Sequence, residues 1–122
     1  LSHTAAHMAR AAIEGAAYSV ADAIVACIEA AGEPDEIALT GGGAEHALPR
    51  RILADVLGRR LGRAQVQDAS AVGAAVLAGA PAPRFRSTEA DAPGPDADAH
   101  RAAWHRQRDA YAALRDVRPE TR

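Results

Sequence analysis

Lysine is absent from this chain, and all 14 of its basic side chains are arginines. The absence excludes a phosphate-loop lysine, a lysine Schiff base and a lysine general base within these 122 residues. Any phosphate bound here would therefore have to be held by backbone N–H groups or by arginine.

Aromatic residues and cysteine are also scarce. Aromatics make up 3% of the chain while hydrophobic residues make up 48%, so Ala, Val, Leu and Ile must build the core. Such a composition favours helices. The single Cys27 cannot form a disulfide within the chain. Its apolar neighbours Val25 and Ile28 predict a buried thiol in a reducing compartment.

Neither charge sign dominates the sequence, whose formal net charge is -2. This balance disfavours nucleic acid and anionic lipid as partners. Asp22 and Glu29 interrupt the longest apolar stretch, and the residues after Leu1 do not form a signal pattern. We therefore expect a cytoplasmic protein that has no membrane partner.

Helical spacing dominates the first eighty residues. Apolar side chains recur every three to five positions over residues 4–31 and predict a long amphipathic helix. Ser2 or Thr4 would cap this helix, and Gly32 followed by Pro34 would end it. Shorter elements are predicted after it: a strand at 36–40, a helix over 48–58, a strand at 65–67 around Val66, and a small-residue helix that Asp68 or Ser70 caps and Gly79 ends.

The composition changes after residue 80. Residues 81–97 are rich in Pro, Ala and Asp, which predicts an irregular linker, and helical spacing returns in the tail. We expect Trp104 of this tail to dock on the rest of the protein. The predicted organisation is a core over 1–80, a linker over 81–97, and a helix with its tail over 98–122.

Three consecutive glycines, Gly41, Gly42 and Gly43, lie between the end of the predicted strand and the start of the next predicted helix. Backbone N–H groups and the helix dipole can face an anion there, which predicts a phosphate or nucleotide cradle. A tight turn that needs positive φ explains the glycines equally well without a ligand. The motif is not a Walker loop, because no Gly-Lys-Ser/Thr follows, and His46 replaces the third glycine of a dinucleotide fingerprint.

Other titratable residues carry weaker signals, and no metal site is predicted. Arg10 and Glu14 are spaced for a salt bridge on one helix face. Asp55 is expected to have a helix-surface or capping role rather than an acid–base role. The histidines are expected to be solvated, because they lack either supporting ligands or a shared helix face: His3, His7, His100 and His105.

Three stretches together are more specific than any one of these motifs. They are Ala-Arg-Ala-Ala-Ile-Glu-Gly-Ala-Ala-Tyr at 9–18, Leu-Thr-Gly-Gly-Gly-Ala at 39–44 with Ala-Asp-Val-Leu-Gly at 54–58, and Ala-Ser-Ala-Val-Gly-Ala-Ala-Val-Leu-Ala at 69–78. In this order and spacing they resemble the C-terminal domain of the FGGY carbohydrate kinases, most closely the xylulokinase-like and gluconokinase-like members. The resemblance covers about residues 1–80.

The resemblance implies an α/β fold, namely a helix-rich C-terminal fragment of an actin-like ATPase (ribonuclease H-like) domain. It implies a nucleotide-binding role for Gly41, Gly42, Gly43, Ala44 and His46, the last standing where the family usually has Ser or Asn. The implied reaction transfers the γ-phosphate of MgATP to a hydroxyl of a small sugar or polyol, and a pentulose such as xylulose is favoured.

The resemblance also implies partners. The general-base Asp and the N-terminal sugar-binding domain of the same protein would lie before Leu1, so no catalytic residue is expected in this chain. The first helix would then leave an apolar surface uncovered, which predicts homo-oligomers. The alternative is a non-catalytic actin-like module that binds a nucleotide or a partner protein.

Overall fold

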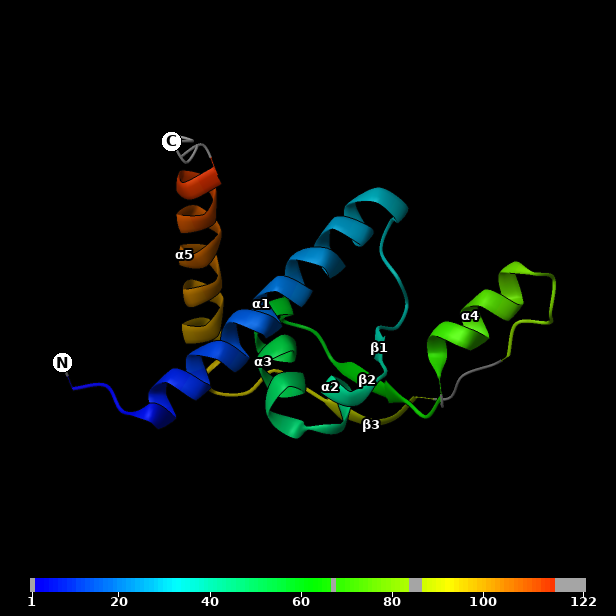
Figure 1. Ribbon diagram of the computed structural model, residues 1–122, viewed down its shortest axis with the longest axis horizontal. Coiled ribbons are helices and arrows are strands. Elements are labelled where there is room, and N and C mark those ends of the chain that lie inside the picture. The colour runs from blue at the N-terminus through cyan, green and yellow to red at the C-terminus, as the bar shows by residue number, and fades with distance from the viewer. Residues whose placement is uncertain (1, 67, 84–86, 116–122) are drawn as a thin grey trace, which may run out of the picture.

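A computed structural model describes residues 2–66, 68–83 and 87–115. The fold contains both helices and strands, and helices predominate (Figure 1). The elements are α1 (Ala5–Ala31), β1 (Ala38–Leu39), α2 (Gly42–Glu45), α3 (Ala47–Leu57), β2 (Leu61–Ala64), α4 (Ala69–Leu77), β3 (Ser87–Asp91) and α5 (Ala97–Arg115).

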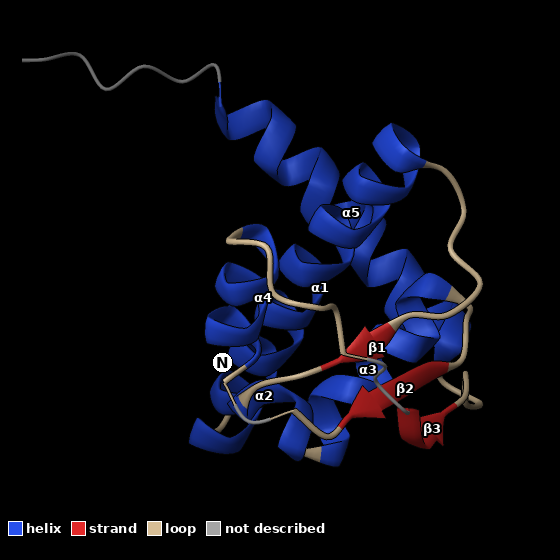
Figure 2. Ribbon diagram, turned by 90° about the vertical axis from the view of Figure 1, so that its right-hand side faces the viewer, coloured by secondary structure: helices blue, strands red, loops and turns tan. Residues whose placement is uncertain are grey.

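The strands form one small mixed sheet in the order β1-β2-β3 (Figure 2). β1 runs parallel to β2 with Ala38 opposite Gly62, and β3 runs antiparallel to β2 with Asp91 opposite Leu61. A side chain at Gly62 would place its Cβ 2.7 Å from the Cβ of Ser87, so glycine is what lets β3 approach β2.

The core lies where α3 packs against α1 and α5. α3 also contacts β2 and β3, so it connects the helices to the sheet. Small residues of α1, such as Ala17 and Ala21, are buried and let the helices approach closely. The buried cluster consists of Ala17, Tyr18, Ala21, Ile52, Leu53, Ala54, Val56, Leu61 and Trp104.

The predicted helix ends are confirmed. Thr4 precedes α1 and donates its backbone N–H to Nδ1 of His7 (3.1 Å), while Gly32 ends α1 with a φ of 90°. Gly58 ends α3 in the left-handed region. The side chain of Asp68 accepts the N–H of Ala71 (3.1 Å) and so caps α4.

Two predicted segments are wrong. The strand expected at 65–67 lies instead at Leu61–Ala64, because buried Leu61 and its neighbours pair with strands on both sides; residue 67 lies outside the described residues. The linker expected over 81–97 contains β3, whose residues lack apolar alternation and pair through their backbone with β2. Residues 84–86 lie outside the described residues.

The sequence predicted that the core ends near residue 80, and this prediction is wrong. Trp104 of α5 is buried among the residues of α1 and α3, which confirms that this side chain docks. The three-part division of the chain stays a prediction, but its first and last parts share one core. α4, in contrast, has no buried residue, and Leu77 is 91% exposed at its end.

Two features of α1 concern its exposed face: the position of Cys27, and an apolar composition that also suits a membrane-spanning helix. Cys27 is exposed, not buried. By length and composition α1 would pass for a membrane-crossing helix, with a mean hydropathy of 1.5. A core helix has the same features, and α1 does bury Tyr18 and Ala21 against its neighbours. The expected absence of a membrane partner stays a prediction.

Tyr18 has a buried hydroxyl that finds no hydrogen-bond partner among the described residues. Burial raises the pKa of Tyr18 above its ordinary value of 10.0, and the charge of Glu14 raises it further, because both disfavour the phenolate. The folded state therefore holds this proton more tightly than the unfolded chain. The stabilisation is complete below the unfolded-state pKa and is lost as pH rises through the folded-state pKa.

Tyr18→Phe is expected to keep or raise stability near neutral pH, because it removes a hydroxyl whose burial without a partner costs about 1–3 kcal/mol. It should also flatten the fall in unfolding free energy above about pH 10. Urea unfolding of both proteins at neutral and alkaline pH measures the two effects. A variant that is less stable at neutral pH would show that the hydroxyl has a partner.

Candidate functional site

The glycine turn connects β1 to α2. Gly41 has a φ of 86°, a conformation that favours glycine, and it precedes the first residue of α2. Gly42 and Gly43 are not in the positive-φ region, and a Cβ added at either would meet no atom within 4 Å. The turn itself therefore accounts for Gly41, whereas the two following glycines leave open space beside the backbone.

A polar cavity of about 470 Å³ opens at this turn. Of the predicted site residues, Gly41, Gly42 and Ala44 line it. Gly43 does not line it, and His46 is exposed at the junction of α2 and α3. The remaining lining residues are Thr40, Glu45, Arg63, Ala64, Gln65, Val66 and Asp68.

Arg63 is the cation of this cavity, and the sequence motifs did not single it out. It lies on β2, which pairs with β1 so that Arg63 stands opposite Leu39, just before the turn. Nη2 of Arg63 lies 3.8 Å from Oε1 of Glu45, a weak ion pair. Asp68 is a further acidic side chain here, and its carboxylate caps α4. The cavity thus combines an arginine with the backbone of Gly41 and Gly42 at the start of α2.

An apolar cavity of about 530 Å³ adjoins the polar one and shares Thr40, Ala64 and Val66 with it. Its other wall is α4, where Gly73 contributes no side chain. Together the two cavities offer a polar region at the glycine turn and an apolar region beside it. Among the described residues no group of three or more His, Cys, Asp or Glu side chains could hold a metal ion.

The sequence model of the FGGY family of carbohydrate kinases, C-terminal domain, matches residues 1–82. This chain belongs to that family. The glycerol kinase of Rhodopirellula baltica is 42% identical over 77 residues, which are 62% of this chain and 14% of that protein. A xylulose kinase of Staphylococcus epidermidis is 37% identical over 76 residues, which are 62% of this chain and 15% of that protein.

Solved structures agree with the family. The xylulose kinase of Rhodospirillum rubrum superposes with a TM-score of 0.73 at 25% identity, over 94% of this chain and 26% of that one. The ligand-bound xylulose kinase of Lactobacillus acidophilus superposes with a TM-score of 0.75 at 22% identity, over the same shares. The actin-like ATPase fold is thereby confirmed, and the chain spans about a quarter or less of the kinases that it matches.

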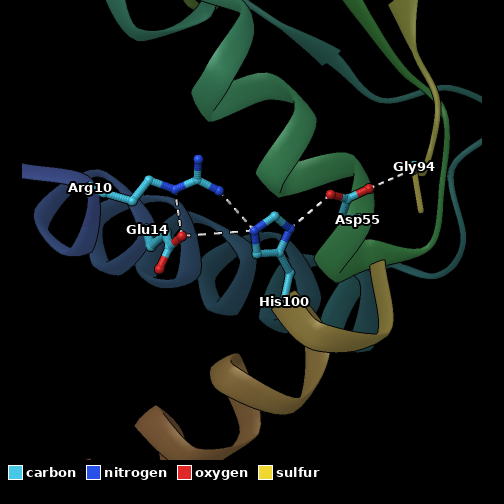
Figure 3. A network of polar contacts seen from close by, with 5 residues as sticks. All are labelled: Arg10, Glu14, Asp55, Gly94 and His100. Atoms are coloured by element: carbon cyan, nitrogen blue, oxygen red, sulfur yellow. Dashed lines mark hydrogen bonds and ion pairs between the residues drawn. The ribbon is translucent and has the colours of Figure 1, made fainter. Parts of the chain in front are cut away.

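A second polar cluster of this FGGY domain joins Arg10, Glu14, Asp55, Gly94 and His100 (Figure 3). Nδ1 of His100 lies 2.8 Å from Oδ2 of Asp55, and the N–H of Gly94 donates to Oδ1 of Asp55 (2.6 Å). Arg10 pairs with Glu14 as predicted (2.5 Å), and its Nη2 lies 3.1 Å from Nε2 of His100. Arginine can only donate, so Nε2 accepts and Nδ1–H donates to Asp55.

This cluster fastens the start of α5 to α1 and α3. Asp55 and His100 are both buried, so the predictions of a surface or capping role for Asp55 and of a solvated His100 are wrong. His3, His7 and His105 are exposed, as expected. No local sequence pattern predicts this contact, because Asp55 and His100 are 45 positions apart and meet only where α5 packs against α3.

Proposed function

We propose that this chain is the ATP-binding C-terminal part of a kinase that transfers the γ-phosphate of ATP to a hydroxyl of a small sugar or polyol. The observation that carries the proposal is the open space at Gly42 and Gly43 beside a cavity lined by Arg63. Backbone N–H groups at the start of a helix bind phosphate well when no side chain intervenes. The adjoining apolar cavity offers a surface suited to a purine ring.

In this proposal the chain binds and orients the nucleotide, and the rest of the kinase completes the site. Arg63 takes the role that lysine has in other phosphate sites. The general base that accepts the proton of the sugar hydroxyl, the sugar-binding domain and most ligands of Mg²⁺ belong to the part that this chain does not include. A pentulose such as xylulose is the preferred acceptor. Glycerol is the second candidate, because several curated relatives are glycerol kinases.

The proposed partner surface is an apolar groove along α1. Its volume is about 630 Å³, and Val20, which is 45% exposed, lies on it. The expected uncovered apolar surface is thus present on α1. We propose that the remainder of the kinase covers it, that the isolated chain self-associates through it, and that the whole protein is cytoplasmic. The other residues that line the groove are Ser19, Ala23, Ile24, Cys27, Ile28, Ala31, Gly32, Pro34, Glu36, Ile37 and Ala38.

Gly42→Val tests the proposed site. The new side chain meets no protein atom at its Cβ and needs no positive φ, so the fold should be kept while the open space is filled. We expect ATP to shift the amide signals of the turn in the unmodified chain, and the variant to bind at least about tenfold more weakly. An ATP titration followed by NMR measures both.

Gly15→Val is the matched control, because it adds the same side chain to α1, where the Cβ would be at an ordinary 3.9 Å from Oε1 of Gln107. Its ATP affinity should equal that of the unmodified chain. Shifts that persist unchanged in Gly42→Val would move the nucleotide away from the glycine turn.

A further inference from the structure

Arg50 is a buried arginine on α3 that contacts two other elements. Its Nε–H donates to Oδ2 of Asp91 on β3 at 2.6 Å, and its Nη1 donates to the backbone oxygen of Ala44 on α2 at 2.7 Å. The side chains of Arg50 and Asp91 are only 9% and 14% exposed. One guanidinium therefore connects β3 to the short helix that carries the glycine turn.

The connection continues into the turn itself. The N–H of Ala44 donates to the backbone oxygen of Gly41 at 2.9 Å. The oxygen of Ala44 lies at the end of α2, where carbonyl groups have no donor in their own helix, and Ala44 is buried. Arg50 supplies the missing donor, so both the N–H and the C=O of Ala44 are hydrogen-bonded.

Asp91 is in turn held by the sheet. It stands opposite Leu61 at the end of β3, and Leu61 is fully buried. Nε of Arg51 lies 3.8 Å from the other carboxylate oxygen, but this side chain is 71% exposed, so its ion pair contributes little. Arg50 is therefore bonded to β3, which lies outside the residues that the family sequence model matches.

We propose that Arg50 and Asp91 are positioning residues of the nucleotide site. They hold the glycine turn in the form that receives phosphate, and they make β3 a necessary part of the site. The inference rests on the proposed function only for the identity of the ligand. A planar guanidinium can bond a carboxylate and a carbonyl at once in fixed directions, which a lysine ammonium at this position cannot do.

The test compares Asp91→Asn with Asp55→Asn. Both substitutions neutralise a carboxylate that anchors the C-terminal segment, buried at Asp55 and partly buried at Asp91, but only Asp91 reaches the glycine turn, through Arg50. Asp91→Asn is expected to raise the exchange rate of the Ala44 amide about tenfold and to weaken ATP binding about tenfold, with Arg50→Lys acting in the same direction. Asp55→Asn should leave both within about twofold of the unmodified chain.

Equal effects of Asp91→Asn and Asp55→Asn on Ala44 exchange would overturn the proposal, because the turn would then respond only to general stability. If the unmodified chain binds no ATP, the proposed function fails. The exchange rates of the Ala44 amide still test whether Arg50 and Asp91 hold the glycine turn in place.

A second measurement applies if Asp91→Asn does not fold. Native-state hydrogen exchange of the unmodified chain in low denaturant should show Ala44 opening at the same free energy as the amides of β2 and β3. Ala44 opening separately and more easily would overturn the proposal.

Discussion

Trp104→Ala is expected to remove a large share of the free energy of unfolding of this protein. The Trp104 side chain is 7% exposed, lies in the core with residues of α1 and α3, and donates its Nε1–H to Oδ1 of Asp22 (3.0 Å). The guanidinium of Arg108 stands 5.2 Å from the ring. Removing such a side chain costs about 3–5 kcal/mol, a large share of the total of about 5–15 kcal/mol that stabilises a typical domain.

Circular dichroism during urea or thermal unfolding measures this loss. Trp104→Phe keeps most of the apolar contact and gives up the hydrogen bond to Asp22, so about 1–2 kcal/mol should be lost. Tyr111→Ala is the control from the same helix, because Tyr111 is 70% exposed and its loss should change little. If Trp104→Ala unfolds at the same midpoint as Tyr111→Ala, then α5 does not contribute to the core.

The isolated 122-residue chain is expected to transfer no phosphate to any sugar. Backbone N–H groups at the glycine turn and Arg63 are present, so weak nucleotide binding should remain. The chain covers 14% of the glycerol kinase and 26% of the xylulose kinase that it matches, and in the proposed function the opposing domain, general base and sugar site lie outside these residues. Without positioning and proton transfer the reaction should fall below detection.

A coupled assay of ADP release with xylulose, gluconate and glycerol measures this expectation. The same assay on Gly42→Val, purified in the same way, identifies contaminating kinases, because their activity would be equal in both samples. Sugar-dependent ADP release that disappears in Gly42→Val would place catalysis within this chain. Nucleotide binding without sugar-dependent release in the full-length protein would favour the alternative of a non-catalytic actin-like module.

Sequence patterns located the elements whose signals are local. Helix α1 and its end at Gly32, the left-handed Gly58 after α3 and the cap at Asp68 follow from residue type and spacing alone. The strands were harder to place. β3 is made of Ser, Thr, Glu, Ala and Asp, whose strand propensities are mostly low, and it exists because the edge of β2 offers backbone partners.

The candidate site likewise has features that follow from the local sequence and features that depend on long-range contacts. The sequence by itself determined the family, the position of the glycine turn and the exclusion of lysine from any phosphate site in these residues, because motifs and composition are properties of the chain. The tertiary structure alone brought Arg63 to the turn, linked Asp91 through Arg50 to Ala44, and buried His100 against Asp55. These contacts join residues up to 45 positions apart, and the pairing of β2 with β3 and the packing of α5 on α3 decide which of them meet.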